Sequence, residues 1–165
     1  MKWLLLALAV AGLAAADHEV MLPGTGLVIS VPAGWVQRDD PHGAALAFRQ
    51  PRGLAGLAAV VSEPTTLGPA GFAKQSLDEL QAGCAGFAVL DSGFGYQMGA
   101  ITWSHVRYRM RLGTVLFEQI AYLTVSEGRG VIITGSAPPE AMAALLPAFE
   151  RAALTAGLSR PTLGK

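Results

Sequence analysis

The sequence predicts an α+β fold: a single antiparallel β-sheet of about six to seven strands flanked by two helices. Most of the chain beyond residue 26 alternates apolar and polar residues with the two-residue period of a strand. Only residues 69–83 and 139–156 have the helical period of apolar positions. Because the strands are grouped instead of alternating singly with helices, an antiparallel sheet is favoured over a doubly wound parallel one.

Residues 1–16 have the composition of a secretory signal peptide. Lys2 precedes an apolar run over residues 3–13, and small residues 14–16 provide a cleavage site. The apolar run is shorter than the about 20 residues that span a membrane, and Asp17 stands where a lipid-bearing cysteine would follow the cut. We therefore expect residues 17–165 to form a single exported domain, periplasmic or secreted, with no stable membrane insertion after cleavage.

Four strands are expected before the first helix, each ended by turn-forming residues. Pro32 ends the first, and loops at 39–43 and 51–53 separate the later ones. The expected strands are Leu27–Val31, Trp35–Arg38, Ala45–Arg49 and Leu57–Val61.

The first helix is expected from Pro69 to Gly83, since proline favours a helix start and glycine a helix end. Gly113 and Thr114 suit a two-residue hairpin turn between two long strands. Residues 93–99 carry three glycines, and we expect a mobile hairpin loop there. The four expected strands after this helix are Phe87–Leu90, Ile101–Leu112, Val115–Val125 and Val131–Gly135.

The last helix is expected over residues 139–156. Pro139 and Glu140 suit its first turn, and an apolar stripe runs along it. Pro147 lacks a backbone N–H donor, so a kink or a break into two shorter helices is expected there.

Two short stretches resemble a known superfamily. The first is Val31–Trp35, a strand end followed by Pro-x-Gly-Trp, and the second is the closing hairpin of residues 121–138 with its terminal helix. Together they resemble the PsbP/DcrB-like superfamily. The resemblance implies an α/β/α sandwich and an exported accessory protein, and it brings no shared set of catalytic residues.

One face of the strand 101–112 carries the candidate binding residues. They are Trp103, His105, Arg107, Arg109 and Arg111. The turn at 113–114 predicts that Arg109 lies opposite Glu118 and His105 opposite Tyr122. Three arginines against one carboxylate can hold an acidic partner or an anion, whereas a solvated polar face is the alternative. If the face binds, replacing Arg107 and Arg111 by alanine weakens binding and leaves stability nearly unchanged.

The sequence offers few groups for catalysis. Asp39, Asp40, His42 or His105 are the candidates for a metal-dependent or hydrolytic enzyme. Cys84 lies among small residues and is expected to be an inert thiol. The glycines at 93–99 lack both the spacing and the following helix of a dinucleotide site. We expect no enzyme activity, no cofactor and no metal.

The charge balance narrows the class of partner. Twelve basic and twelve acidic residues give a formal net charge of zero, so the chain lacks the excess of positive charge with which proteins bind nucleic acid. The expected function is a non-enzymatic accessory or binding protein that contacts another envelope or secreted protein through its sheet face and loops. An immunity or chaperone protein for a secreted toxin is a further alternative.

Overall fold

The computed structural model describes residues 16–40, 43–84 and 86–158, and it contains two helices and nine strands in these ranges. The helices are α1 (Pro69–Gly83) and α2 (Pro139–Leu158). The strands are β1 (His18–Met21), β2 (Val28–Val31), β3 (Val36–Gln37), β4 (Leu46–Arg49), β5 (Gly56–Pro64), β6 (Ala88–Met98), β7 (Ile101–Leu112), β8 (Val115–Ser126) and β9 (Arg129–Ala137).

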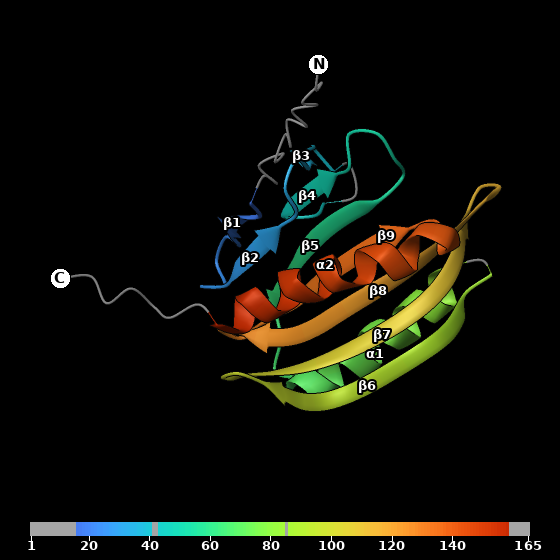
Figure 1. Cartoon of the computed structure of the whole chain (residues 1–165). Coiled ribbons are helices and arrows are strands. Elements are labelled where there is room, and N and C mark those ends of the chain that lie inside the picture. The colour runs from blue at the N-terminus through green and yellow to red at the C-terminus, as the bar shows by residue number, and fades with distance from the viewer. Residues whose placement is uncertain (1–15, 41–42, 85, 159–165) are drawn as a thin grey trace, which may run out of the picture.

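Seven of these strands form one antiparallel sheet in the order β3-β4-β5-β9-β8-β7-β6. α1 packs on one face of the sheet, and α2 packs on the other beside the small sheet β1–β2 (Figure 1). The predicted α+β class is therefore confirmed. The hairpin between β7 and β8 is also confirmed, since Leu112 pairs with Val115 across the turn and Gly113 has the positive φ of 62° that favours glycine.

The first predicted strand does not join the main sheet. It corresponds to β2, which pairs with β1 in a separate two-stranded sheet, and β1 was not predicted. Ile29 and Val31 of β2 are fully buried in the same core as the apolar residues of α2. β1, β2 and α2 together thus cover one face of the large sheet.

The prediction of a mobile loop over residues 93–99 is wrong, because β6 continues to Met98. Its pairing with β7 shifts register twice, between Val89 and Asp91 and between Gly93 and Tyr96. A Cβ on Gly93 would lie 2.7 Å from Cε1 of His105, so the histidine ring occupies the space that a side chain would take. These glycines therefore allow the bulges of an edge strand and the close approach of the His105 ring.

The break expected at Pro147 is also not found. α2 is one helix from residue 139 to 158, with Pro147 exposed on its outer side. Opposite it, the buried ring of Phe149 lies directly over Gly135 of β9, and it meets the indole of Trp35 edge-on at 6.1 Å. Trp35 is thus a buried member of the core beneath α2.

The two faces of the sheet are covered to different extents. The core on the side of α1 consists of α1 and residues of β7 and β8, with Phe72 of α1 lying over Gly130 of β9. The α1 face of β4, β5 and the end of β9 is left open.

Within the described ranges, neither helix is both long and apolar enough to cross a membrane. Residues 1–15 of the expected signal peptide, and His42, lie outside the described ranges.

Candidate functional site

The predicted binding residues lie on β7, on the face of the sheet that α2 covers. The predicted register is confirmed: Arg109 pairs with Glu118, and His105 pairs with Tyr122. The five residues nevertheless differ in what they present to solvent, so each is described in turn.

Trp103 is fully buried and belongs to the core beneath α2. Its Nε1 is the one buried side-chain nitrogen or oxygen without a hydrogen-bond partner among the described residues. The sequence had suggested that Trp103 belongs to a binding surface. Because no part of the indole reaches solvent, Trp103 does not contribute to such a surface. The burial follows from α2 and β6, whose Tyr96 pairs with Trp103 across the sheet.

Arg107 and Arg109 both bind the carboxylate of Glu118. The Nε of Arg107 donates to Oε1 at 2.7 Å, and the Nε of Arg109 donates to Oε2 at 3.1 Å. The side chain of Glu118 is only 2% exposed, whereas the two arginine side chains are 33% and 45% exposed. The two guanidinium groups therefore neutralise a buried carboxylate, and only part of their charge is offered to a partner.

His105 is held between two residues of the edge strand β6. Its Nε2 lies 3.1 Å from Oδ2 of Asp91, and its Nδ1 lies 3.3 Å from the hydroxyl of Tyr96. The hydrogen bond with His105 is the main cause that lowers the pKa of Asp91 below its usual value. These contacts fix the edge strand to β7 and leave the imidazole one quarter exposed.

Arg111 is the remaining member of the predicted set, and it is exposed. Among the described residues it has no ion pair, and its methylene groups lie near Gly86. Close by, Leu112 and Val115 at the tip of the β7–β8 hairpin are also exposed. The positive surface predicted for this strand is thus concentrated at the hairpin.

The structure separates His105 from the other described groups proposed for an enzyme, and His42 lies outside the described residues. Asp39, Asp40 and Cys84 line the open face on the side of α1, whereas His105 lies on the face that α2 covers. The sheet stands between them, so neither an Asp–His metal site nor a Cys84–His105 pair forms from these residues. No group of three His, Cys, Asp or Glu side chains with metal-site geometry occurs in the described part of the chain.

Sequence reasoning missed a groove of about 860 Å³ beside α1. Its floor is the open sheet face from β4 to β7. One wall is the second half of α1 with Cys84, and the opposite rim is the loop before β4. We call this hollow the α1 groove. Its walls include Ser76, Glu79 and Leu80 on α1, and Arg38, Asp39 and Asp40 on the opposite rim.

The floor of the α1 groove is low because its side chains are small. Ala47 pairs with Ala58, Ala58 with Thr134, and Thr134 with Ala121. This row crosses four strands without one large side chain. Large apolar side chains stand around it, and three of them are exposed to solvent: Leu54, Val60 and Leu112. The groove therefore presents an open apolar surface of the kind that marks binding sites.

A polar row lies next to the row of small residues. Ser136 pairs with Gln119, and Gln119 pairs with Tyr108. The hydroxyl of Tyr108 donates to Oε1 of Gln119 at 2.6 Å. A mostly apolar hollow with a few hydrogen-bonding groups is the usual composition of a small-molecule site. The alternation of apolar and polar residues along β8 predicts that Gln119 lies on this face. That Gln119 is open to a ligand depends on how little of the face α1 covers, which the sequence does not indicate.

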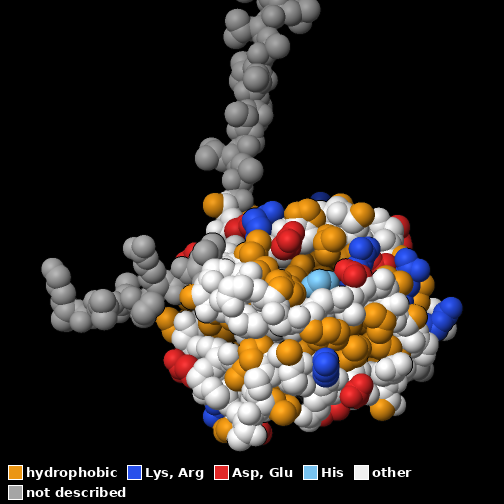
Figure 2. All heavy atoms as spheres, turned by 90° about the horizontal axis from the view of Figure 1, so that it is seen from below, with side chains coloured by type: hydrophobic (Ala, Val, Ile, Leu, Met, Phe, Trp, Pro, Cys, Tyr) orange, Lys and Arg blue, Asp and Glu red, His pale blue; other side chains and the backbone are white. Residues whose placement is uncertain are grey.

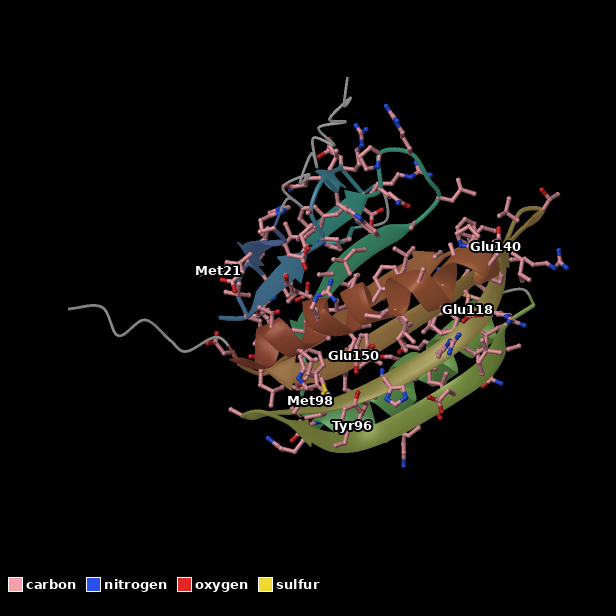
Figure 3. All side chains as sticks on the ribbon, viewed as in Figure 1. Met21, Tyr96, Met98, Glu118, Glu140 and Glu150 are labelled. Atoms are coloured by element: carbon pink, nitrogen blue, oxygen red, sulfur yellow. The ribbon has the colours of Figure 1, made fainter. Side chains whose placement is uncertain are left out.

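All three tyrosines have a raised pKa, which gives a test of the packing on both faces. Burial, with the negative charge of Glu150 as a smaller cause, raises the pKa of Tyr96 from 10.0 to about 12, and Figure 3 shows Tyr96 and Met98 of β6 near Glu150 of α2. Burial also raises the pKa values of Tyr108 and Tyr122, by still more.

We expect no phenolate absorbance at 295 nm from the folded protein near pH 10, where the unfolded chain ionises. A folded-state pKa above the unfolded one gives stability that is complete below pH 10 and is lost as the pH rises toward about 12. Phenolate absorbance and the loss of near-UV circular dichroism should therefore rise together in an alkaline titration. Ionisation of two or three tyrosines near pH 10 with an intact fold would contradict the packing.

The comparisons with known proteins identify the fold. No protein-family model matches the chain, and no curated protein matches its sequence. Solved structures do match. PsbP (CyanoP) from Synechocystis sp. PCC 6803 is 17% identical with a TM-score of 0.65, over 87% of this chain and 94% of that one.

Two further solved structures have the same fold. LpqN of Mycobacterium tuberculosis, described as involved in cell envelope biogenesis, is 14% identical with a TM-score of 0.56, over 82% of this chain and 86% of that one. The Ran-binding protein Mog1p of Saccharomyces cerevisiae is 14% identical with a TM-score of 0.53, over 87% and 89%. The chain therefore has the PsbP/DcrB-like fold that its sequence resemblance implied.

Proposed function

We propose that this chain is an exported, non-enzymatic accessory protein that acts by binding, and that the α1 groove is its binding site. The observation that carries the proposal is the open apolar groove itself, in which the exposed side chains of Leu54, Val60 and Leu112 surround a floor of small residues. A ligand that covers exposed apolar surface in a hollow removes this surface from water, and the free energy gained favours the complex.

The chemistry of the floor supports binding without catalysis. Its polar side chains are a phenol, an amide and hydroxyl groups, from Tyr108, Gln119, Thr134 and Ser136. Burial raises the pKa of Tyr108 above its usual value, and its hydroxyl donates to Oε1 of Gln119, which leaves the hydroxyl oxygen as an acceptor for a ligand. Such groups orient a ligand and contribute specificity.

The fold supports an accessory role in the envelope. The sequence of residues 1–16 predicts export. Among the similar structures, one is described as involved in cell envelope biogenesis and another as a Ran-binding protein. We extend to this chain the general role of a binding protein, with another envelope or secreted protein as the partner that receives or presents the bound molecule.

A protein-binding surface at the β7–β8 hairpin is the second candidate. Arg111, Leu112 and Val115 are exposed there, and this small patch combines a cation without an ion pair among the described residues with apolar side chains. Figure 2 shows that apolar side chains also gather between scattered charges on the lower side of the molecule. The test below separates the hairpin from the α1 groove.

Cys84 provides the measurement, because it is the only cysteine of the chain and lines the α1 groove. We expect an extract of the native envelope to slow the reaction of Cys84 with a maleimide. Amide hydrogen exchange in the same mixture should slow on β5 and β9, which form the floor.

The control is the Ala58→Leu variant, which fills the floor of the groove. In this variant the extract should no longer protect the β5 and β9 amides. If the extract protects only the amides of the β7–β8 hairpin and leaves Cys84 labelling unchanged, the hairpin is the binding surface and the groove proposal is wrong.

A further inference from the structure

We infer that the α1 groove binds a single-chain anionic amphiphile, with its head group at Arg38 and Arg49 and its chain along the floor toward Phe117. This inference rests on the proposed function and adds the chemical class of the ligand. Its basis is the distribution of polar and apolar groups along the groove, together with a second hollow at one end.

The two ends of the groove differ in polarity. At the β3–β4 end the lining residues are charged, and they are the arginines Arg38 and Arg49 and the carboxylates Asp39 and Asp40. At the β7–β8 end they are apolar, and Met110 pairs there with Phe117. A molecule that matches both ends has a charged group at one end and a hydrocarbon body at the other.

The length of the groove suits an extended chain. Its floor crosses five adjacent strands, from β4 through β5, β9 and β8 to β7. Neighbouring strands are about 4.8 Å apart, so the four gaps give roughly 19 Å. The row of Ala47, Ala58, Thr134 and Ala121 leaves a track without large side chains over the first four of these strands, and Gln119 and Phe117 continue the same face of β8 toward the apolar end.

Two arginines determine the sign of the head group. Arg49 lies opposite Val36, and the backbone N–H of Arg38 donates to the carbonyl of Ala47, so both arginines belong to the groove side of the sheet. Both are exposed, and neither has an ion pair among the described residues. Arginine binds carboxylate and phosphate through charge-assisted pairs of hydrogen bonds.

A second, polar hollow adjoins this end and has a volume of about 380 Å³. It shares Arg38, Asp39 and Arg49 with the groove and adds Gln50. Of the nearby carboxylates, Asp40 accepts the backbone N–H of Ala44 at 3.2 Å, and Glu79 accepts the side-chain amide of Gln75 at 2.9 Å. Asp39 alone is shared by both hollows, so two guanidinium groups outnumber it where a head group would lie.

The floor argues against a peptide as the occupant. It is the face of a sheet, where the backbone N–H and C=O groups are already paired in the ladder, so an extended peptide finds no backbone partners there. The hydroxyl of Tyr108 is also engaged with Gln119. An alkyl chain needs no such partners and gains from the burial of its apolar surface.

The inference is tested with four defined probes, kept below the concentrations at which they form micelles or separate from water: dodecanoate, dodecyl phosphate, dodecanol and butanoate. Calorimetry gives the affinities, and Cys84 labelling locates the site. Dodecanoate and dodecyl phosphate are expected to bind and, at ten times Kd, to slow labelling about tenfold. Dodecanol, without charge-assisted hydrogen bonds, should bind at least about tenfold more weakly, and butanoate should not protect Cys84.

Variants assign the head group. The double change Arg38→Gln and Arg49→Gln should weaken dodecanoate binding to the level of dodecanol and leave dodecanol binding unchanged. Arg52→Gln is the matched control, since Arg52 is an exposed arginine of the β4–β5 loop that lines neither hollow. Equal binding of dodecanoate and dodecanol, or full dodecanoate affinity in the double variant, would overturn the anionic head group.

The envelope extract separates this inference from the proposed function. If the extract protects Cys84 and the long-chain probes do not, the groove binds something else, and the amphiphile inference is wrong although the proposed function stands. Protection that disappears after protease treatment of the extract identifies a protein occupant and also overturns it. Protection that disappears after removal of lipids with organic solvent supports it, and protection by neither extract nor probes overturns both proposals.

Discussion

Replacing Gly135 by alanine is expected to lower the free energy of unfolding by about 2–3 kcal/mol. A Cβ at this position would overlap the ring of Phe149. That ring is fully buried and lies edge-on against Trp35, so it has no free space into which to move. Urea unfolding of the variant measures the loss.

Two further variants show that the contact with Phe149 is the cause. Gly56→Ala is the control on a neighbouring strand, because a Cβ there would meet the carbonyl oxygen of Phe48 at an ordinary 3.5 Å. We expect a change within about 0.5 kcal/mol. In a Phe149→Leu background the cost of Gly135→Ala should fall, with a coupling energy of about 1 kcal/mol or more. Equal losses for both glycines, or strict additivity, would contradict this account.

Removing Arg107 and Arg109 together is expected to cost about 3 kcal/mol of unfolding free energy, the lower end of the range for breaking a buried ion pair. The reason is that Glu118 stays behind, 2% exposed and without its cations. The lower end applies because both arginines are partly in water. Thermal and urea unfolding of the double alanine variant provide the measurement.

Glu118→Gln should cost clearly less than the double arginine change, because the two arginines left behind can turn to solvent. Arg111→Ala should leave stability unchanged, since Arg111 is exposed and has no ion pair among the described residues. A larger loss for Glu118→Gln than for the arginine pair would contradict the role given to the buried carboxylate. The sequence alone had suggested that Arg107 and Arg111 are equally dispensable for stability, and the contact with Glu118 corrects that expectation for Arg107.

Local patterns predicted those parts of the fold that depend on neighbours in sequence. The turn at Gly113 and Thr114 sets the β7–β8 register, so the opposition of Arg109 and Glu118 could be read directly from residue numbers. The start of α1 follows an equally local rule, since Pro69 stands at its first position.

Other parts depend on packing between distant segments. The glycines of residues 93–99 look like a loop until the ring of His105 is placed against Gly93. Trp103 looks like a surface residue beside arginines until α2 and Tyr96 enclose it. The α1 groove arises because α1 covers only part of its face, and the strand pattern contains no information on that coverage.

The two outer strands of the sheet limit how copies of this chain can associate. At one end β6 has two register shifts and a left-handed Gly95, and at the other end β3 is only two residues long. A regular, long border would act as a template on which a second molecule adds its own strand, which is the first step of fibrous aggregation. With one border irregular and the other very short, neither outer strand of the seven-stranded sheet provides such a template.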